Sequence, residues 1–407
     1  MRCKKYFFMC LLIVFCISMI TIPCLGINNS IYVWSSQVTG DDTKETSANT
    51  VELNLQCESA ILIEQNTGKV LYEKNPHEQL RPASVTKIMS ILLIMEAIDS
   101  GKIQYTDTVP CSENAASMGG SQIWLDTRET LTVDEMLKAI CVNSANDCTV
   151  AMAEFLEGST QQFVQKMNEK AKSLGMKDTV FKNCHGLDED GHVTSSYDIS
   201  LMSRELLIKH PDITKYTTIW TDTLRDGKSS LTNTNKLIRN YKGATGLKTG
   251  STSLALYNLS ASATRDNLSL IAVIMRAPTT KDRFNDAETL LNYGFGQYSY
   301  VQFAKKEEVV NTIQVKKGTT ITLPVIYEQD ASILVQKGQE KNIEQEINLP
   351  EEIEAPIEKG QIVGEVIYKQ DGKEIARTNL IANETIKKLT FINMLEKVYS
   401  TWFRVLR

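Results

Sequence analysis

Apolar and polar residues alternate with two different periods along this chain, and each period predicts one kind of secondary structure. Residues 58–75 (ESAILIEQNTGKVLYEKN) alternate with the period of a strand on both sides of a turn at Asn66-Thr67-Gly68. Residues 253–277 predict two longer strands around a turn at Arg265-Asp266-Asn267. Elsewhere in the first part of the chain, apolar residues recur at helical spacing. The predicted helices occupy residues 82–101, 132–158, 159–176, 195–210 and 282–298.

These elements predict two domains. Asn143-Ser144-Ala145-Asn146-Asp147 breaks the apolar spacing of residues 132–158, which predicts helix, break, helix. Helices in the middle with strands at both ends favour an α+β domain over residues 53–298, built on an antiparallel sheet. Residues 299–383 change to short Val-, Ile- and Thr-rich segments, with a hairpin signal at Asp371-Gly372. We expect a small all-β sandwich there, since 407 residues are too many for one core.

The N-terminal end has a pattern of its own. Residues 1–26 place basic residues before an apolar run and a small-residue exit, which predicts a secretory signal peptide cleaved after Gly26. An uncleaved membrane anchor is the alternative. Residues 27–52 are polar and rich in Ser and Thr, so we interpret them as a linker.

Residues 384–407 read as a basic amphipathic helix. Ile386, Trp402 and Phe403 fall with other apolar residues on one face, and basic residues fall largely on the other. Such a helix suits a membrane interface, where aromatic side chains anchor it. Polar residues interrupt its apolar residues, so it is not apolar over the length that is needed to span a bilayer. The alternative is a terminal helix docked on its own protein.

Composition narrows the classes of function. The chain is 42% hydrophobic and 23% charged, which is typical of a soluble globular protein. Its net charge of -5 argues against a general nucleic-acid binder. The five cysteines after the signal are odd in number and form no C-x-x-C, so we interpret them as buried hydrophobes rather than a zinc site, with one disulfide left open. We likewise interpret His185 and His192 as structural, and expect no metal or cofactor.

Three short motifs carry the candidate chemistry. Ser84-Val85-Thr86-Lys87 opens a predicted helix, Ser144-Ala145-Asn146 lies at the helix break, and Lys248-Thr249-Gly250 begins a strand. Taken singly, each could be a helix cap, a surface residue or a turn. Together and in this order they are typical of penicillin-binding proteins and class A β-lactamases.

The residue types suit acyl transfer to a serine. Ser84 would be the nucleophile, and Lys87, one turn away, its base. Burial and a second cation, for which Lys248 is the candidate, would lower the pKa of Lys87. Ser144 would relay a proton to the leaving amine, while Asn146 would hold a substrate amide and help to fix Lys87.

The third motif suits substrate binding. Lys248 and Thr249 would bind a substrate carboxylate. Gly250 would let the substrate backbone lie close to the strand edge. The backbone N–H groups of Ser84 and Ser251 are the candidates for an oxyanion hole.

These motifs and their surroundings resemble the low-molecular-mass penicillin-binding proteins that are D-alanyl-D-alanine carboxypeptidases of serine peptidase family S11. The resemblance is carried by SAILIEQNTGKVLYEKN, PASVTKIMSILL, HGLDEDGHVTSSYDISLMSRELL and GATGLKTGSTSLALYNLSASA. It covers about residues 55–298, and the β domain and amphipathic tail match the family's architecture. One departure is Ala145, where the family usually has Gly or a similar small residue.

The resemblance implies a β-lactamase/transpeptidase-like fold and an acyl-enzyme on Ser84. It implies removal of the terminal D-Ala from peptidoglycan stem pentapeptides, inhibition by β-lactams, and no metal. It also implies an extracytoplasmic enzyme held to the outer face of the plasma membrane by residues 384–407.

Three other functions are weighed against this one. A D,D-endopeptidase that cuts cross-links would use the same active-site residues. A class A β-lactamase would need a deacylating Glu-x-x-x-Asn segment, which residues 147–247 do not contain. A non-enzymatic cell-wall binding protein is disfavoured because every reactive residue is present.

Overall fold

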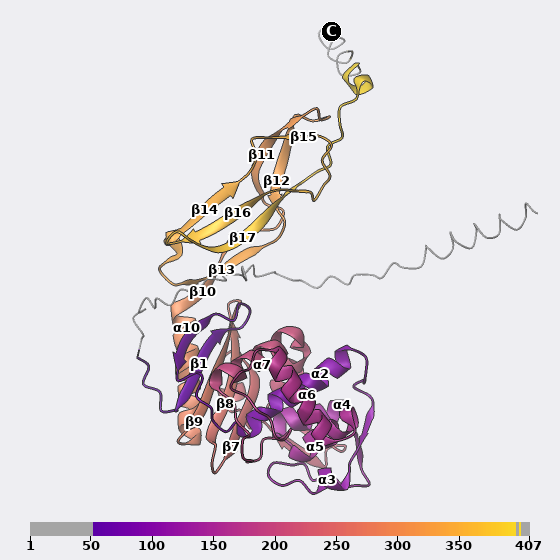
Figure 1. The fold of residues 1–407 in the computed structure, drawn as a ribbon, viewed down its shortest axis with the longest axis vertical. Coiled ribbons are helices and arrows are strands. Elements are labelled where there is room, and N and C mark those ends of the chain that lie inside the picture. Colours follow the sequence, from indigo (N-terminus) through magenta and orange to yellow (C-terminus); the bar gives the residue numbers. More distant parts are fainter. Residues whose placement is uncertain (1–51, 396–398, 400–407) are drawn as a thin grey trace, which may run out of the picture.

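The computed structural model describes residues 52–395 and Tyr399, and it confirms the predicted α+β class (Figure 1). The predicted signal peptide and all but the last residue of the predicted linker lie outside the described residues. In the part of the chain that the structure describes, no helix is both long and apolar enough to cross a bilayer.

A five-stranded antiparallel sheet forms the centre of the first domain, in the order β2-β1-β9-β8-β7. The predicted turns join its neighbouring strands, and Asp266 and Asn267 have the positive φ angles of a tight hairpin. The strands are β1 (Ser59–Glu64), β2 (Val70–Lys74), β7 (Ala244–Thr252), β8 (Leu256–Arg265) and β9 (Leu268–Ala277).

Helices cover both faces of this sheet. Four of them begin where the sequence supplies a cap: Thr132, Ser159, Ser195 and Thr279 each accept a hydrogen bond from the backbone N–H three residues later. The longer helices are α2 (Lys87–Asp99), α4 (Val133–Lys138), α5 (Asn146–Glu157), α6 (Thr160–Ser173), α7 (Ser196–Lys209) and α10 (Thr280–Gln297).

Shorter pieces complete the domain. Two small hairpins pair β3 (Thr108–Pro110) with β4 (Thr130–Thr132) and β5 (Thr221–Leu224) with β6 (Ser229–Thr232). The remaining helical turns are η1 (Ala83–Thr86), α3 (Glu113–Ala116), η2 (Ala139–Asn143), η3 (Pro211–Ile213), α8 (Thr214–Thr217) and α9 (Leu237–Asn240).

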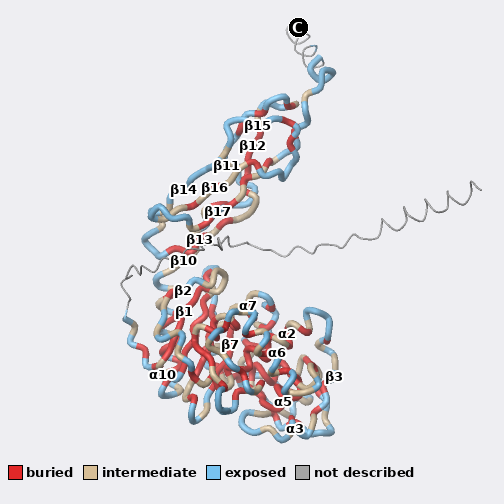
Figure 2. The backbone as a smooth tube through the Cα atoms, in the orientation of Figure 1, coloured by how far each residue is buried: buried red, intermediate tan, exposed pale blue. Residues whose placement is uncertain are grey.

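The sheet separates two hydrophobic cores because alternate strand residues point to opposite faces. Ile61 and Ile63 of β1 join the core beneath the helices α2 and α4 to α7, whereas Ala60 and Leu62 join the core beneath α10. Figure 2 shows that the strands of the sheet and much of the helical part of the domain are buried. Each fully buried large aliphatic side chain contributes on the order of 2 kcal/mol to folding.

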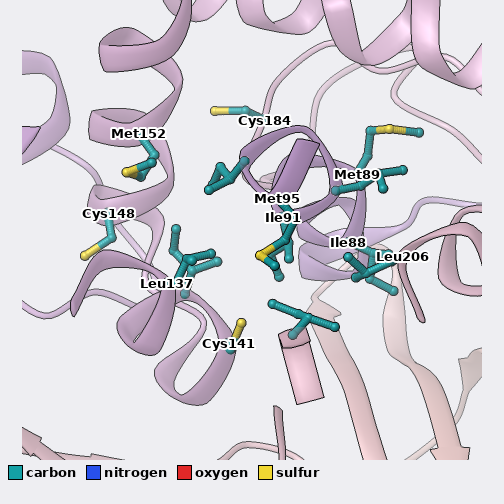
Figure 3. Close-up of a cluster of buried hydrophobic side chains, with 14 of the residues drawn as sticks. Ile88, Met89, Ile91, Met95, Leu137, Cys141, Cys148, Met152, Cys184 and Leu206 are labelled. Carbon is teal, nitrogen blue, oxygen red and sulfur yellow. The ribbon is translucent and has the colours of Figure 1, made fainter. Parts of the chain in front are cut away.

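Helix α2 runs through the larger core and is buried along most of its length. Figure 3 shows its side chains packed against residues of the surrounding helices and loops, among them Cys141, Cys148 and Cys184. All five cysteines among the described residues are free and buried, which confirms their interpretation as small hydrophobes: Cys57, Cys111, Cys141, Cys148 and Cys184.

The second domain is built from strands, as predicted, and extends away from the first (Figure 1). Its six-stranded sheet has the order β14-β16-β17-β12-β11-β15, beside the pair β10-β13. The predicted boundary at residue 299 falls one residue inside β10. The strands are β10 (Tyr298–Ala304), β11 (Val309–Lys316), β12 (Thr322–Tyr327), β13 (Ala331–Gln336), β14 (Ile343–Asn348), β15 (Glu352–Glu354), β16 (Ile362–Gln370) and β17 (Lys373–Ala382), with a turn η4 (Glu340–Asn342).

The start of the predicted tail helix is wrong. Residues 384–390 are not helical, and helix is described only from Phe391 onward. Ile386 is 1% exposed in the core of the β domain, where it forms a β-bridge with Ile357. It is therefore a core residue of the β domain rather than part of an exposed apolar helix face.

Candidate active site

The predicted nucleophile and its predicted base are in direct contact. Ser84 lies in the single turn η1, which leads into α2, and Lys87 is the first residue of α2. Lys87 Nζ is 2.9 Å from Ser84 Oγ. Lys87 is fully buried, whereas Ser84 is half-buried, so the serine can meet a substrate while the lysine stays away from bulk water.

Burial suits Lys87 to the role of a base, because it favours the neutral amine. Loss of hydration, helped by the nearby Lys248 charge, lowers the pKa of Lys87 well below its ordinary value. The other groups that act on it, Cys184 and Asp147, oppose this shift. Lys87 Nζ also donates a hydrogen bond to the carbonyl of His185 at 2.6 Å. A neutral amine has a free electron pair that can accept a proton. The hydrogen bond to the carbonyl of His185 holds the Lys87 amine in the position where this pair can face the Ser84 hydroxyl.

The second motif lies where one helix ends and another begins. Ser144 has a left-handed φ of 63° between η2 and α5, a conformation that costs a non-glycine residue on the order of 1 kcal/mol. The predicted break is therefore present but shorter than expected, because Asn146 and Asp147 already belong to α5. The Asp147 carboxylate accepts hydrogen bonds from the N–H groups of Ile123 and Leu125.

Two polar atoms of this motif are buried without a partner among the described residues. They are Ser144 Oγ and Asn146 Oδ1. The Asn146 side chain donates from Nδ2 to the carbonyl of Gly119 at 2.7 Å, so the expectation that it fixes Lys87 is wrong. The carbonyl of His185 does that instead. Buried unpaired polar atoms cost free energy, and a bound ligand is what would satisfy them.

The third motif lies on the edge strand β7. Lys248 is buried, and its Nζ donates to the carbonyl of Thr249 at 2.8 Å. Burial lowers the pKa of Lys248 to about 7, with a smaller contribution from Arg283 in the same direction and an opposing one from Cys141. Thr249 Oγ1 donates to Thr234 Oγ1 at 2.7 Å.

Gly250 allows β7 to approach the nucleophile closely. A Cβ atom at this position would lie 2.9 Å from Ser84 N, Val85 N and the carbonyl of Pro82. The next residue, Ser251, is exposed. The structure thus brings the strand that carries Ser251 against the turn that carries Ser84, as a shared oxyanion hole would require.

The loop of residues 183–192 is the part of the site that motif reasoning missed. Besides the His185 carbonyl on Lys87, the loop places Gly186 so close to η1 that a Cβ there would lie 1.9 Å from the carbonyl of Ala83. A backbone carbonyl has no signature of its own in a sequence. The segment HGLDEDGH could have indicated this loop, because its glycines allow the backbone to approach other elements closely. Attention to its two histidines alone did not indicate this.

His192 has the structural role expected of it. Its Nδ1 accepts a hydrogen bond from Lys182 N at 2.9 Å, which leaves Nε2–H to donate to Thr86 Oγ1 at 2.8 Å. Burial lowers its pKa to about 4, so the ring stays neutral. Within the described ranges, no group of three or more His, Cys, Asp or Glu residues is placed to hold a metal ion.

Comparison with known proteins agrees with this geometry. The sequence profile of the D-alanyl-D-alanine carboxypeptidase family, peptidase S11, matches residues 43–279. The profile of the penicillin-binding protein 5 C-terminal domain matches residues 298–388. The chain is 47% identical to D-alanyl-D-alanine carboxypeptidase DacF of Bacillus subtilis over 363 residues, which cover 88% of this chain and 93% of the relative.

Solved structures show the same architecture. Penicillin-binding protein 5 from Haemophilus influenzae superposes with a TM-score of 0.68 at 31% identity, covering 83% of this chain and 99% of that one. Penicillin-binding protein D2 from Listeria monocytogenes, solved in its ampicillin-bound form, gives a TM-score of 0.55 at 31% identity and covers 60% and 99% of the two chains. The chain therefore belongs to the D-alanyl-D-alanine carboxypeptidase family, peptidase S11, and carries that family's peptidase domain followed by a penicillin-binding protein 5-type C-terminal domain.

Proposed function

We propose that this protein is a serine D,D-carboxypeptidase that removes the terminal D-alanine from peptidoglycan stem pentapeptides during cell-wall maturation. One observation carries the proposal: the buried Lys87 amine lies 2.9 Å from the half-buried Ser84 hydroxyl, at the edge strand that bears the third motif. Family membership supports the same reaction, since the relatives are named as D-alanyl-D-alanine carboxypeptidases.

Acylation follows from the positions of the side chains. Neutral Lys87 takes the proton of Ser84 while Oγ attacks the carbonyl carbon of the penultimate D-Ala. The N–H groups of Ser84 and Ser251 stabilise the oxyanion. Ser144 relays the proton from Lys87 to the amine of the terminal D-Ala, the C–N bond breaks, D-Ala leaves, and Lys87 is neutral again. The peptide remains as an ester on Ser84.

Deacylation uses the same base in reverse. Lys87 takes a proton from water, the hydroxide attacks the ester carbonyl, and Ser84 recovers its proton as the shortened peptide leaves. Lys248 and Thr249 bind the C-terminal carboxylate in the first step, and Asn146 Oδ1 accepts from a substrate amide. A β-lactam would acylate Ser84 in the same way, and the ampicillin-bound Listeria relative supports this class of inhibitor.

The proposed site of action is outside the cytoplasm, at the outer face of the plasma membrane. The reasons are the location of peptidoglycan, the signal-like pattern of residues 1–26 and the exposed apolar side chains Phe391 and Ile392. Labelling of intact cells by a penicillin that does not cross the membrane tests this location; absence of labelling until the cells are broken would contradict it.

The reaction is tested by D-alanine release from diacetyl-Lys-D-Ala-D-Ala, with Ser84→Ala as the matched control. We expect the wild-type protein to release one D-Ala per peptide and to be labelled by a fluorescent penicillin, and the variant to do neither. A folded wild-type protein that is labelled by the penicillin but splits cross-linked muropeptide dimers into monomers, without releasing D-Ala, would be an endopeptidase instead. Hydrolysis of the penicillin faster than of the peptide would identify a β-lactamase.

A further inference from the structure

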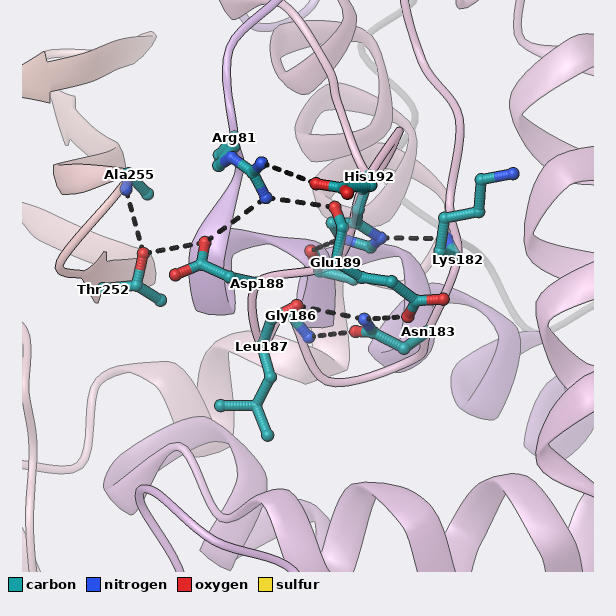
Figure 4. A network of polar contacts seen from close by, with 12 residues as sticks. Arg81, Lys182, Asn183, Gly186, Leu187, Asp188, Glu189, His192, Thr252 and Ala255 are labelled. Carbon is teal, nitrogen blue, oxygen red and sulfur yellow. Dashed lines mark hydrogen bonds and ion pairs between the residues drawn. The ribbon is translucent and has the colours of Figure 1, made fainter.

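Three segments that are far apart in sequence meet beside the nucleophile in one polar network (Figure 4). The first is Arg81, three residues before Ser84. The second is the loop of residues 183–192, and the third is Thr252, at the end of β7. Figure 4 shows the Asp188 side chain between Arg81 and Thr252.

The contacts place Asp188 at the junction. Thr252 Oγ1 donates to Asp188 Oδ1 at 3.0 Å, and Arg81 Nη1 is 3.9 Å from the same oxygen. Arg81 also donates to the carbonyl of Glu189 at 3.1 Å and to Asp190 Oδ1 at 3.2 Å. Among the described contacts of the loop, the Asp188–Thr252 hydrogen bond is the one that reaches β7.

The two ends of this connection carry different halves of the site. Three residues before Asp188, the carbonyl of His185 holds Lys87 Nζ at 2.6 Å. Two residues before Thr252 stands Gly250, whose backbone lies against Ser84 N. A shift of the loop therefore moves the base, and a shift of β7 moves the surface on which the substrate lies.

Stability does not explain the network. The side chains of Arg81 and Asp188 are 30% and 24% exposed, and partly exposed ion pairs contribute little to folding. What the contact does supply is a fixed separation between the loop and the strand. A displacement of the reacting groups by about 1 Å can cost about 100-fold in rate.

We propose that Asp188 is a positioning residue, which sets the Lys87 amine against the substrate-binding strand by tying the 183–192 loop to Thr252. This inference rests on the proposed function. It assigns to Asp188 no contact with substrate, because its partners are Thr252 and Arg81.

The test is the second-order rate constant for acylation of the full chain by a fluorescent penicillin, measured together with the melting temperature. The variants are Asp188→Ala, Thr252→Val, their combination, and Thr252→Ser, which keeps the hydroxyl. Asp190→Ala is the matched control, because this carboxylate lies in the same loop on the same arginine without a described contact to β7.

We expect Asp188→Ala and Thr252→Val each to lower the rate constant by about 10- to 100-fold. The double variant should be no slower than the slower single one, because the Asp188–Thr252 contact is lost in both single variants; Thr252→Val also removes the hydrogen bond from Ala255 N to Thr252 Oγ1. Thr252→Ser keeps the hydroxyl and should therefore retain most of the wild-type rate constant. The rate constant of Asp190→Ala should stay within about twofold of wild type. Melting temperatures should shift by no more than about 2–4 °C.

Two results would overturn the inference. One is wild-type acylation by Asp188→Ala; the other is losses in the two single variants that multiply in the double variant. Failure of the proposed function is distinguishable, since it would appear in the wild-type protein itself, as no acylation or no release of D-Ala from the peptide, whereas the inference is judged from the acylation rates of the variants relative to wild type.

Discussion

At the scale of single residues, the proposed reaction depends on two buried lysines, Lys87 and Lys248. Burial disfavours the charge of both, but their tasks require opposite protonation states. Lys87 must be neutral to accept a proton, and Lys248 must be charged to bind a carboxylate. The pKa of Lys87 is lowered well below its ordinary value, which favours the neutral amine, whereas Lys248, with a pKa lowered to about 7, keeps a share of its charge near neutral pH.

The lowered pKa of Lys248 predicts a pH dependence of carboxylate binding. Lys248 is charged below about pH 7 and loses its proton as the pH rises through that value, so carboxylate binding should weaken. We expect kcat/KM for a D-Ala-D-Ala peptide to fall above about pH 7, and kcat to fall only at higher pH, because a bound carboxylate favours the charged lysine.

Steady-state rates from pH 5 to pH 10 measure both profiles. The matching control is the same peptide ending in a carboxamide, which offers Lys248 no anion and should lack the fall in kcat/KM. A kcat/KM that stays level to about pH 9 for the free acid would mean that Lys248 keeps its charge in the cleft or does not bind the carboxylate.

The sequence was a good guide to side chains at this scale and a poor one to backbone groups. Ser84, Lys87 and Lys248 could be found because their chemistry is written in their residue types and spacing. The carbonyl of His185, which holds Lys87, could not, because every residue has a carbonyl and only the fold decides which one points into a site. The partner of Asn146 was assigned wrongly for the same reason.

At the scale of elements, the approach of β7 to η1 decides whether the nucleophile and the substrate strand share one site. Gly250→Ala would place a methyl group 2.9 Å from backbone atoms of Pro82, Ser84 and Val85, none of which can move without moving the turn. We expect the variant to lose most of its acylation rate, by about 100-fold, while the domain still folds.

Gly296→Ala provides the control for this prediction. Gly296 lies in α10, and a Cβ there would meet nothing within 4 Å. This change should raise the free energy of unfolding by about 1 kcal/mol and leave acylation unchanged. Penicillin labelling and thermal unfolding of both variants provide the measurement. Normal labelling of Gly250→Ala would show that β7 can move back from η1 at no cost to the chemistry.

Elements were predictable where they are long and regular. The strands of the β1-β2 and β8-β9 hairpins and the helices α6, α7 and α10 repeat their apolar spacing often enough to be recognised. The hairpins β3-β4 and β5-β6 and the four-residue helices α3, α8 and α9 are too short for any period to show. Asn146 and Asp147 were read as part of a break because their polar side chains serve partners in a distant loop.

At the scale of the whole molecule, the two domains were predictable, because apolar residues change from helical spacing to short Val-, Ile- and Thr-rich segments. The end of the second domain was not predictable. The bridge from Ile386 to Ile357 spans residues far apart in sequence, and an isoleucine followed by lysines fits an amphipathic helix equally well. Thr319 N donates to the carbonyl of Lys387, and Leu389 N donates to that of Lys317, so the segment up to residue 389 is bonded to the β domain.

The corrected boundary predicts that stability and membrane binding can be separated. Removal of residues 391–407 should leave D-alanine release and the melting of the β domain unchanged, because the Ile386 bridge remains, but should abolish sedimentation with vesicles containing phosphatidylglycerol. Ile386→Ala in the full chain should have the opposite effect: it should lower the melting temperature of the β domain and leave sedimentation with vesicles unchanged. This substitution leaves a cavity in the core of the β domain, which should lower its free energy of unfolding by about 2–5 kcal/mol, and it keeps the tail.

Vesicle sedimentation and calorimetry of the two variants test this separation. The shortened chain should lose only vesicle binding, and Ile386→Ala should lose only stability. If the shortened chain still sediments with vesicles, the membrane contact lies elsewhere on the protein; if Ile386→Ala melts like wild type, residues 384–390 are not part of the β domain in solution.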